Sequence, residues 1–83
     1  MNIYMHPHAM ERLLERGATE EEVNMTIKTG ERLPARLGRT RFRKSFHFGS
    51  TWRGSFYVTK EVEAVAIPEG EDWLVITVVT RYS

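Results

Sequence analysis

The stretch RTRFRKSFHF, residues 39–48, alternates basic or polar side chains with mostly aromatic ones. Its odd positions are Arg39, Arg41, Arg43, Ser45 and His47, and its even positions are Thr40, Phe42, Lys44, Phe46 and Phe48. Successive side chains of a β-strand point to opposite faces of a sheet, so this period of two predicts a strand. We expect the aromatic face, with Phe42 and Phe46, to be buried beneath helices. The face that carries the arginines and His47 should be exposed.

The residues after this strand continue the β pattern. Residues 49–54 contain two glycines and predict a turn. Residues 55–59 and 62–67 predict either one long bent strand or two short ones, and residues 68–72 predict a second turn. Residues 73–82 are β-branched and apolar on both faces, which is typical of a strand in the centre of a sheet.

The residues before the strand of residues 39–48 follow a helical period and predict two short helices. The first, about residues 7–16, opens with Pro7 and ends before Gly17, a residue suited to a left-handed C-terminal position. Its apolar stripe consists of Met10, Leu13 and Leu14. The second, about residues 19–29, opens at a Thr-x-x-Glu capping box and ends before Gly30. The predicted fold class is therefore α+β: two N-terminal helices packed on one face of a twisted antiparallel sheet of three to five strands.

Size and composition indicate a single domain over residues 1–83, with 41% hydrophobic residues for one small core. The chain has no cysteine, which excludes a disulfide framework, a thiol nucleophile and a thiolate zinc site. The longest apolar run, residues 74–79, is much shorter than a membrane span, and the N-terminus lacks the pattern of a targeting segment. We expect a soluble cytoplasmic protein.

The charges are segregated along the chain, although the formal net charge is only +1. Residues 32–60 contain eight basic side chains and no acidic one, whereas the segments on either side are net acidic. Arginine forks pair with phosphate oxygens and aromatic rings stack on bases, so we expect a nucleic acid partner, RNA before duplex DNA. The alternative is a solvated strand face that protects an edge from pairing. The candidate nucleic-acid-binding residues are Arg12, Arg16, Arg39, Arg41, Arg43, Lys44, Arg53 and Trp52. The alternative role for Trp52 is to cover the end of the sheet.

A family resemblance rests on the segment from His8 to Val23, which follows the pattern H-A-x-x-R-x-x-x-R-G-[IA]-[ST]-x-x-x-V. It resembles the opening of a family of small uncharacterised bacterial domains, and residues 75–80 resemble that family's last strand. These domains are grouped with the RelE, ParE and BrnT toxins. The resemblance implies a RelE-like fold and an antitoxin partner that covers the basic face. RelE-like members cut RNA and ParE-like members do not, so the resemblance implies fold more strongly than activity.

The candidate catalytic residues are His8, His47 and Arg81. Cleavage of RNA by its own 2′-hydroxyl needs a base, a donor for the leaving oxygen and positive charge near the phosphate. His8 lies four residues before Arg12 on one helix face, although a histidine near a helix start often only caps or packs. His47 shares a strand face with the arginines, and the alternative is an exposed strand residue without a role in catalysis. The resemblance to RelE-like nucleases adds Arg81, from the end of the last strand.

The His6-Pro7-His8 segment has no neighbouring Asp, Glu or Cys ligand for a closed metal site, so we expect neither a metal nor another cofactor. Three functions remain. The first is an RNA-binding endoribonuclease of the toxin-antitoxin type, metal-independent, acting on free or ribosome-associated RNA. The second is a non-catalytic RNA-binding module. The third is a protein-interaction domain on a ParE-like fold.

Overall fold

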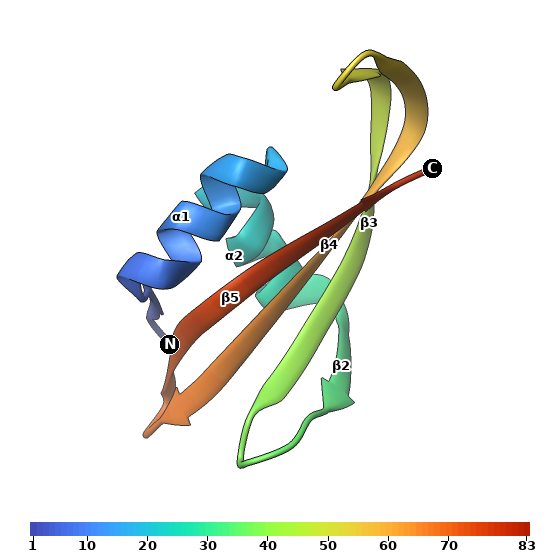
Figure 1. The fold of residues 1–83 in the computed structure, drawn as a ribbon. Helices are drawn as coiled ribbons and strands as arrows, with labels where there is room; N and C mark the ends of the chain where they lie inside the picture. The colour runs from blue at the N-terminus through green and yellow to red at the C-terminus, as the bar shows by residue number, and fades with distance from the viewer.

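The structure, a computed structural model, describes all residues 1–83 as two helices packed on one face of a five-stranded sheet (Figure 1). The elements in chain order are β1 Ile3–Met5, α1 Pro7–Arg16, α2 Glu20–Thr29, β2 Glu31–Pro34, β3 Thr40–Trp52, β4 Ser55–Glu69 and β5 Asp72–Tyr82. The strand order across the sheet is β1-β5-β4-β3-β2. The predicted α+β class is confirmed. No helix is long and apolar enough to cross a membrane.

The sheet is mixed and not wholly antiparallel, because β1 pairs parallel to β5. β1 was not predicted from the sequence. Its three residues are too few to display a period of two, and they pair with residues some 70 positions away, Trp73 to Val75. The expectation that the last strand is central was also wrong. β4 is the central strand, and β5 has a second neighbour only along the short length of β1.

The strands are longer and the turns shorter than expected. β3 continues through residues 49–52, which were predicted as a turn, because a register shift between His47 and Ser50 lets the strand pass Gly49. The turn itself is only Arg53-Gly54, since Trp52 already pairs with Ser55. β4 is one long strand, which decides between the two alternatives for that segment.

The core lies between the helices and the sheet face that carries Phe42. Phe42 is 3% exposed and contacts Trp73 edge to face, with ring centroids 5.0 Å apart. Phe46 is partly buried against the same cluster. The other members of the core are Ala9, Leu13, Ala18, Val23, Ile27, Val62, Ala64, Ala66, Val75 and Val78. The prediction of one buried aromatic face is confirmed.

Helix α1 buries a narrower stripe than expected. Ala9 and Leu13 are buried, Met10 is half-buried and Leu14 is 75% exposed. The helix packs mainly on β5, toward one side of the sheet, so only a thin part of its surface meets apolar neighbours. The Leu14 assignment to the core was therefore wrong.

The predicted helix ends are confirmed with one difference. Gly17 is left-handed with φ 72°, and Thr19 and Glu22 form the complete capping box at the start of α2. Gly30 ends α2 in an extended and not a left-handed conformation. A Cβ there would collide with the backbone carbonyl oxygens of Thr26 and Arg43, which accounts for a glycine at this position.

Candidate functional site

The open face of the sheet carries arginines, as predicted, but carboxylates lie among them. The Arg43 side chain pairs with Glu31 of β2, and the Arg81 guanidinium lies 2.9 Å from Glu61 and 3.2 Å from Glu63 of β4. The carboxylates that neutralise the acid-free segment thus come from neighbouring strands. The strand register brings them close to the arginines, although they lie outside that segment in the sequence. Arg41 also faces Glu63, at 4.0 Å.

These contacts hold the two best-paired arginines in their charged form. A hydrogen bond with Glu31 and its negative charge raise the pKa of Arg43. Burial lowers the pKa of Arg81, but hydrogen bonds with Glu63 and Glu61 outweigh this effect, and the net pKa is raised. Because carboxylates partly neutralise their charges, Arg43 and Arg81 attract a phosphate less strongly than an unpaired guanidinium does.

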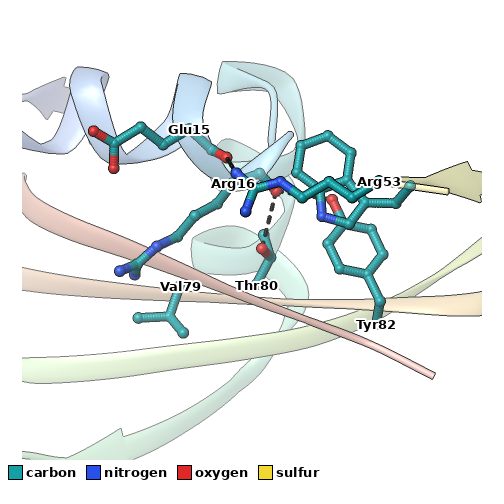
Figure 2. Close-up of a pocket in the computed structure, with 7 residues that line it drawn as sticks. Glu15, Arg16, Arg53, Val79, Thr80 and Tyr82 are labelled. Atoms are coloured by element: carbon teal, nitrogen blue, oxygen red, sulfur yellow. Dashed lines mark hydrogen bonds between the residues drawn. The ribbon is translucent and has the colours of Figure 1, made fainter. Parts of the chain in front are cut away.

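The C-terminal end of α1 is bound to the sheet, around a shallow pocket of about 470 Å³ (Figure 2). The Arg16 guanidinium donates to the carbonyl oxygen of Val78 at 2.8 Å, and the Arg16 carbonyl oxygen accepts from the Thr80 hydroxyl at 2.9 Å. Arg53 donates to the Glu15 carbonyl oxygen at 2.8 Å. Arg16 and Arg53, two of the predicted nucleic-acid-binding arginines, therefore satisfy backbone carbonyl groups of β5 and of the end of α1.

Aromatic rings complete this attachment. Trp52 stacks on Tyr82 with centroids 5.2 Å apart and an interplanar angle of 14°, and it lies over Gly17. Burial raises the pKa of the Tyr82 phenol, which donates to the Arg16 carbonyl oxygen at 2.8 Å. Trp52 thus covers the end of the sheet, the second of its two predicted roles.

A second pocket, of about 440 Å³, has a different composition. It is lined by His6, His8, Arg39, Ile67, Ile76 and Thr77. His6 and His8 come from the start of α1, and Arg39 immediately precedes β3. No carboxylate lines the pocket, and no ion pair involves Arg39. Two candidate residues from the sequence, His8 and Arg39, are therefore brought together.

Local geometry fixes the orientation of His6. As the N-cap of α1, its Nδ1 accepts a hydrogen bond from the backbone N–H of His8 at 3.1 Å. The neutral ring must then carry its proton on Nε2. This leaves His6 with an N–H donor for a ligand, while the His8 side chain, two residues later, is exposed.

An irregularity of the sheet shapes the floor of the same pocket. Val65 pairs with Thr77 and Ala66 pairs with Val75, so Ile76 is an extra residue in β5. Such bulges redirect neighbouring side chains and are common next to functional sites. Here the extra residue brings both Ile76 and Thr77 to the pocket lining.

A family model described as Domain of unknown function (DUF4258) matches residues 5–80. The chain belongs to the DUF4258 family. The match covers every residue that lines the pocket of His6, His8 and Arg39, and every residue except Tyr82 that lines the pocket at the end of α1. Neither a curated protein nor a solved structure matches the chain.

The remaining candidate residues of this DUF4258 domain lie outside the second pocket. His47 is exposed on β3, eight positions beyond Arg39, or roughly 26 Å at the usual rise of a strand. Arg12 pairs with Glu15 at 2.7 Å, and Lys44 pairs with no carboxylate. His8 and His47 are thus too far apart to act on one phosphate.

His6 and Thr77 line the pocket but were not among the residues predicted from the sequence. Pro7 at the first helical position already implied that His6 is the N-cap, a signal that could have placed it beside His8. Thr77 gave no such signal, since its position depends on the bulge. No group of three or more potential metal-ligating side chains is found in this DUF4258 domain.

Proposed function

We propose that this protein binds RNA and cleaves it by attack of the 2′-hydroxyl on the adjacent phosphate, without a metal ion. The reaction centre is the pocket of His6, His8 and Arg39. One observation carries the proposal: two imidazoles and a guanidinium that no carboxylate neutralises line the same pocket. Elsewhere on the open face, the arginines are occupied by glutamates.

Each polar group has a role that its geometry supports. His8, exposed and outside any ion pair, accepts the proton of the 2′-hydroxyl as the oxygen attacks phosphorus. The Nε2–H of His6 and the guanidinium of Arg39 donate to the non-bridging oxygens, where negative charge accumulates. The bond from phosphorus to the 5′-oxygen breaks, and solvent protonates the leaving oxygen. The products are a 2′,3′-cyclic phosphate and a 5′-hydroxyl.

The RelE-like character of the fold belongs to the same proposal. It is supported by the order of two helices followed by an antiparallel hairpin of long strands, and by the resemblance of the segment from His8 to Val23 to domains grouped with those toxins. On this basis we propose a toxin-antitoxin context, in which a protein partner covers the pocket. The alternatives, an RNA-binding module and a ParE-like interaction domain, would have the same fold but would not cleave RNA.

Single-turnover cleavage of a long RNA, with metals chelated, tests the reaction. His8→Ala should slow cleavage by about 10²- to 10⁴-fold while leaving RNA affinity little changed, because a general base acts mainly in the transition state. His6→Asn keeps an N-capping side chain and removes the Nε2–H donor, so it should slow cleavage without unfolding α1. Arg39→Ala should weaken both binding and cleavage.

His47→Ala is the matched comparison, since it removes an exposed imidazole outside the pocket. We expect it to cleave at the wild-type rate. If His47→Ala is as slow as His8→Ala, the pocket is not the reaction centre. If the wild type binds RNA but cleaves none, even with ribosomes present, the RNA-binding module is the better description.

A further inference from the structure

Two turns of this sheet hold a residue other than glycine in the left-handed region: Leu37 with φ 61° and Arg53 with φ 49°. The turns lie at opposite ends of the sheet, the first between β2 and β3 and the second between β3 and β4 (Figure 1). Residues other than Gly, Asn and Asp seldom adopt this backbone conformation, because it costs free energy that other interactions must offset.

The compensation for Arg53 lies within the molecule. Its guanidinium donates to the Glu15 carbonyl oxygen at 2.8 Å and lies 5.1 Å from the centre of the Trp52 ring. Both contacts require the Arg53 side chain to extend from the turn toward Glu15 and Trp52. The conformation of Arg53 is therefore explained by the attachment of α1 to the sheet.

Leu37 has no such explanation. Its side chain is 86% exposed, the largest exposed fraction among the large apolar residues. It is followed by Gly38 with φ 71°, and the Arg39 N–H donates to the Arg36 carbonyl oxygen at 3.2 Å. Two consecutive positive φ values in such a turn are the pattern that favours Asn-Gly. A leucine here costs stability and gains no contact within the chain.

The neighbours of Leu37 indicate what it contacts. Arg36 and Arg39 flank the turn, both are exposed, and neither belongs to an ion pair. Arg39 also lines the pocket of His6 and His8. An apolar tip between two unpaired cations is complementary to a ligand with an apolar surface between two phosphates. One nucleotide base in a single strand has that form.

We propose that Leu37 packs against an unstacked base of the RNA, between the phosphate that Arg39 holds at the pocket and the next phosphate, which Arg36 contacts. The preferred substrate is then a single-stranded or looped RNA segment. In an A-form duplex the base faces are covered by their stacked neighbours, and a leucine cannot reach them. This inference rests on the proposed function, since it names the substrate of the same pocket.

Leu37→Asn separates function from folding, because it creates the favoured Asn-Gly turn while it removes the apolar tip. Its unfolding midpoint in urea should be higher than that of the wild type. Its affinity for a 2′-O-methylated single-stranded RNA of mixed sequence, which has no attacking hydroxyl, should be about 5- to 30-fold weaker, the lower part of the range for base stacking on side chains. Binding to the corresponding duplex should be weak and unchanged.

Leu14→Asn is the control, since it removes another exposed leucine, on α1, and should bind single-stranded RNA like the wild type. Wild-type affinity in Leu37→Asn, or an equal loss for single strand and duplex, would overturn the role of Leu37. A lower unfolding midpoint would overturn the claim that the leucine is held at a cost. The cleavage assay tests the proposed reaction separately. If the wild type does not cleave RNA but Leu37→Asn still weakens binding to single-stranded RNA, the proposed reaction is wrong and the proposed Leu37–base contact stands.

Discussion

Position 17 requires a glycine for two reasons, the backbone conformation and the lack of space for a side chain. Its φ of 72° is unfavourable for other residues, and a Cβ would lie 2.6 Å from the Trp52 ring and 2.7 Å from the Tyr82 hydroxyl. The residue therefore ends α1 and also admits the rings that attach the helix to the sheet.

Gly17→Ala should lower the free energy of unfolding by about 3–5 kcal/mol, as left-handed strain and steric overlap add. Gly70→Ala is the matched control, with a similar φ of 64° and no atom within 4 Å of the added Cβ. It should cost only about 1–2 kcal/mol, the backbone part alone. Urea denaturation of both variants measures the difference, and equal losses would show that the aromatic rings move aside freely.

At the scale of elements, Lys60 joins α1, α2 and β4. Its buried Nζ donates to the Gly17 carbonyl oxygen at 3.0 Å and lies 2.8 Å from the Glu22 carboxylate, while the Phe48 ring centre is 5.2 Å away. The cation thus satisfies the C-terminal end of one helix and the capping carboxylate of the next. This explains how two short helices keep a fixed position on the sheet.

Lys60→Met should lower the free energy of unfolding by about 2–3 kcal/mol, because it leaves the partly buried Glu22 carboxylate without its cation. The double variant Lys60→Met with Glu22→Gln should recover roughly 1 kcal/mol, since glutamine still serves the capping box and carries no charge. Denaturant unfolding of the two variants provides the test. A double variant less stable than Lys60→Met would contradict the assigned role of the Glu22 charge.

At the scale of the whole molecule, folding gives most basic side chains of residues 32–60 a partner within the chain. Of these eight basic side chains, only Arg36, Arg39 and Lys44 lack a carboxylate, carbonyl or aromatic partner. The free positive charge is therefore smaller than the sequence suggests, and two of the three free cations lie at the β2–β3 turn. RNA should approach the molecule at that end of the sheet.

The salt dependence of RNA affinity measures this difference. Three neutralised phosphates should give a log–log slope of about −2, whereas contacts from all eight cations would give about −5.6, at about −0.7 per phosphate. Arg43→Ala, which removes a cation already paired with Glu31, should leave the slope unchanged. Arg39→Ala should make it shallower by about 0.7. A steep slope that Arg43→Ala reduces would show that RNA displaces the glutamates.

Local features of the sequence determined the parts of the fold that depend on neighbours in the chain. Pro7, the Thr19 capping box and Gly17 set the helix ends through contacts within a few residues. The alternation around Phe42 set one strand and its buried face, because the side-chain period of a strand is two. The same local reading proposed His8 and Arg39 as separate candidate residues.

Only the tertiary structure decided which distant residues meet. The pairing of β1 with β5, the glutamates beside the arginines and the extra residue Ile76 in the pocket floor all depend on strand register. Register is set by the packing of the whole sheet against its helices, so no short segment encodes it alone. For this reason the sequence could predict a basic strand, whereas the position of its unpaired charge, at Arg39 beside His6 and His8, follows from the fold.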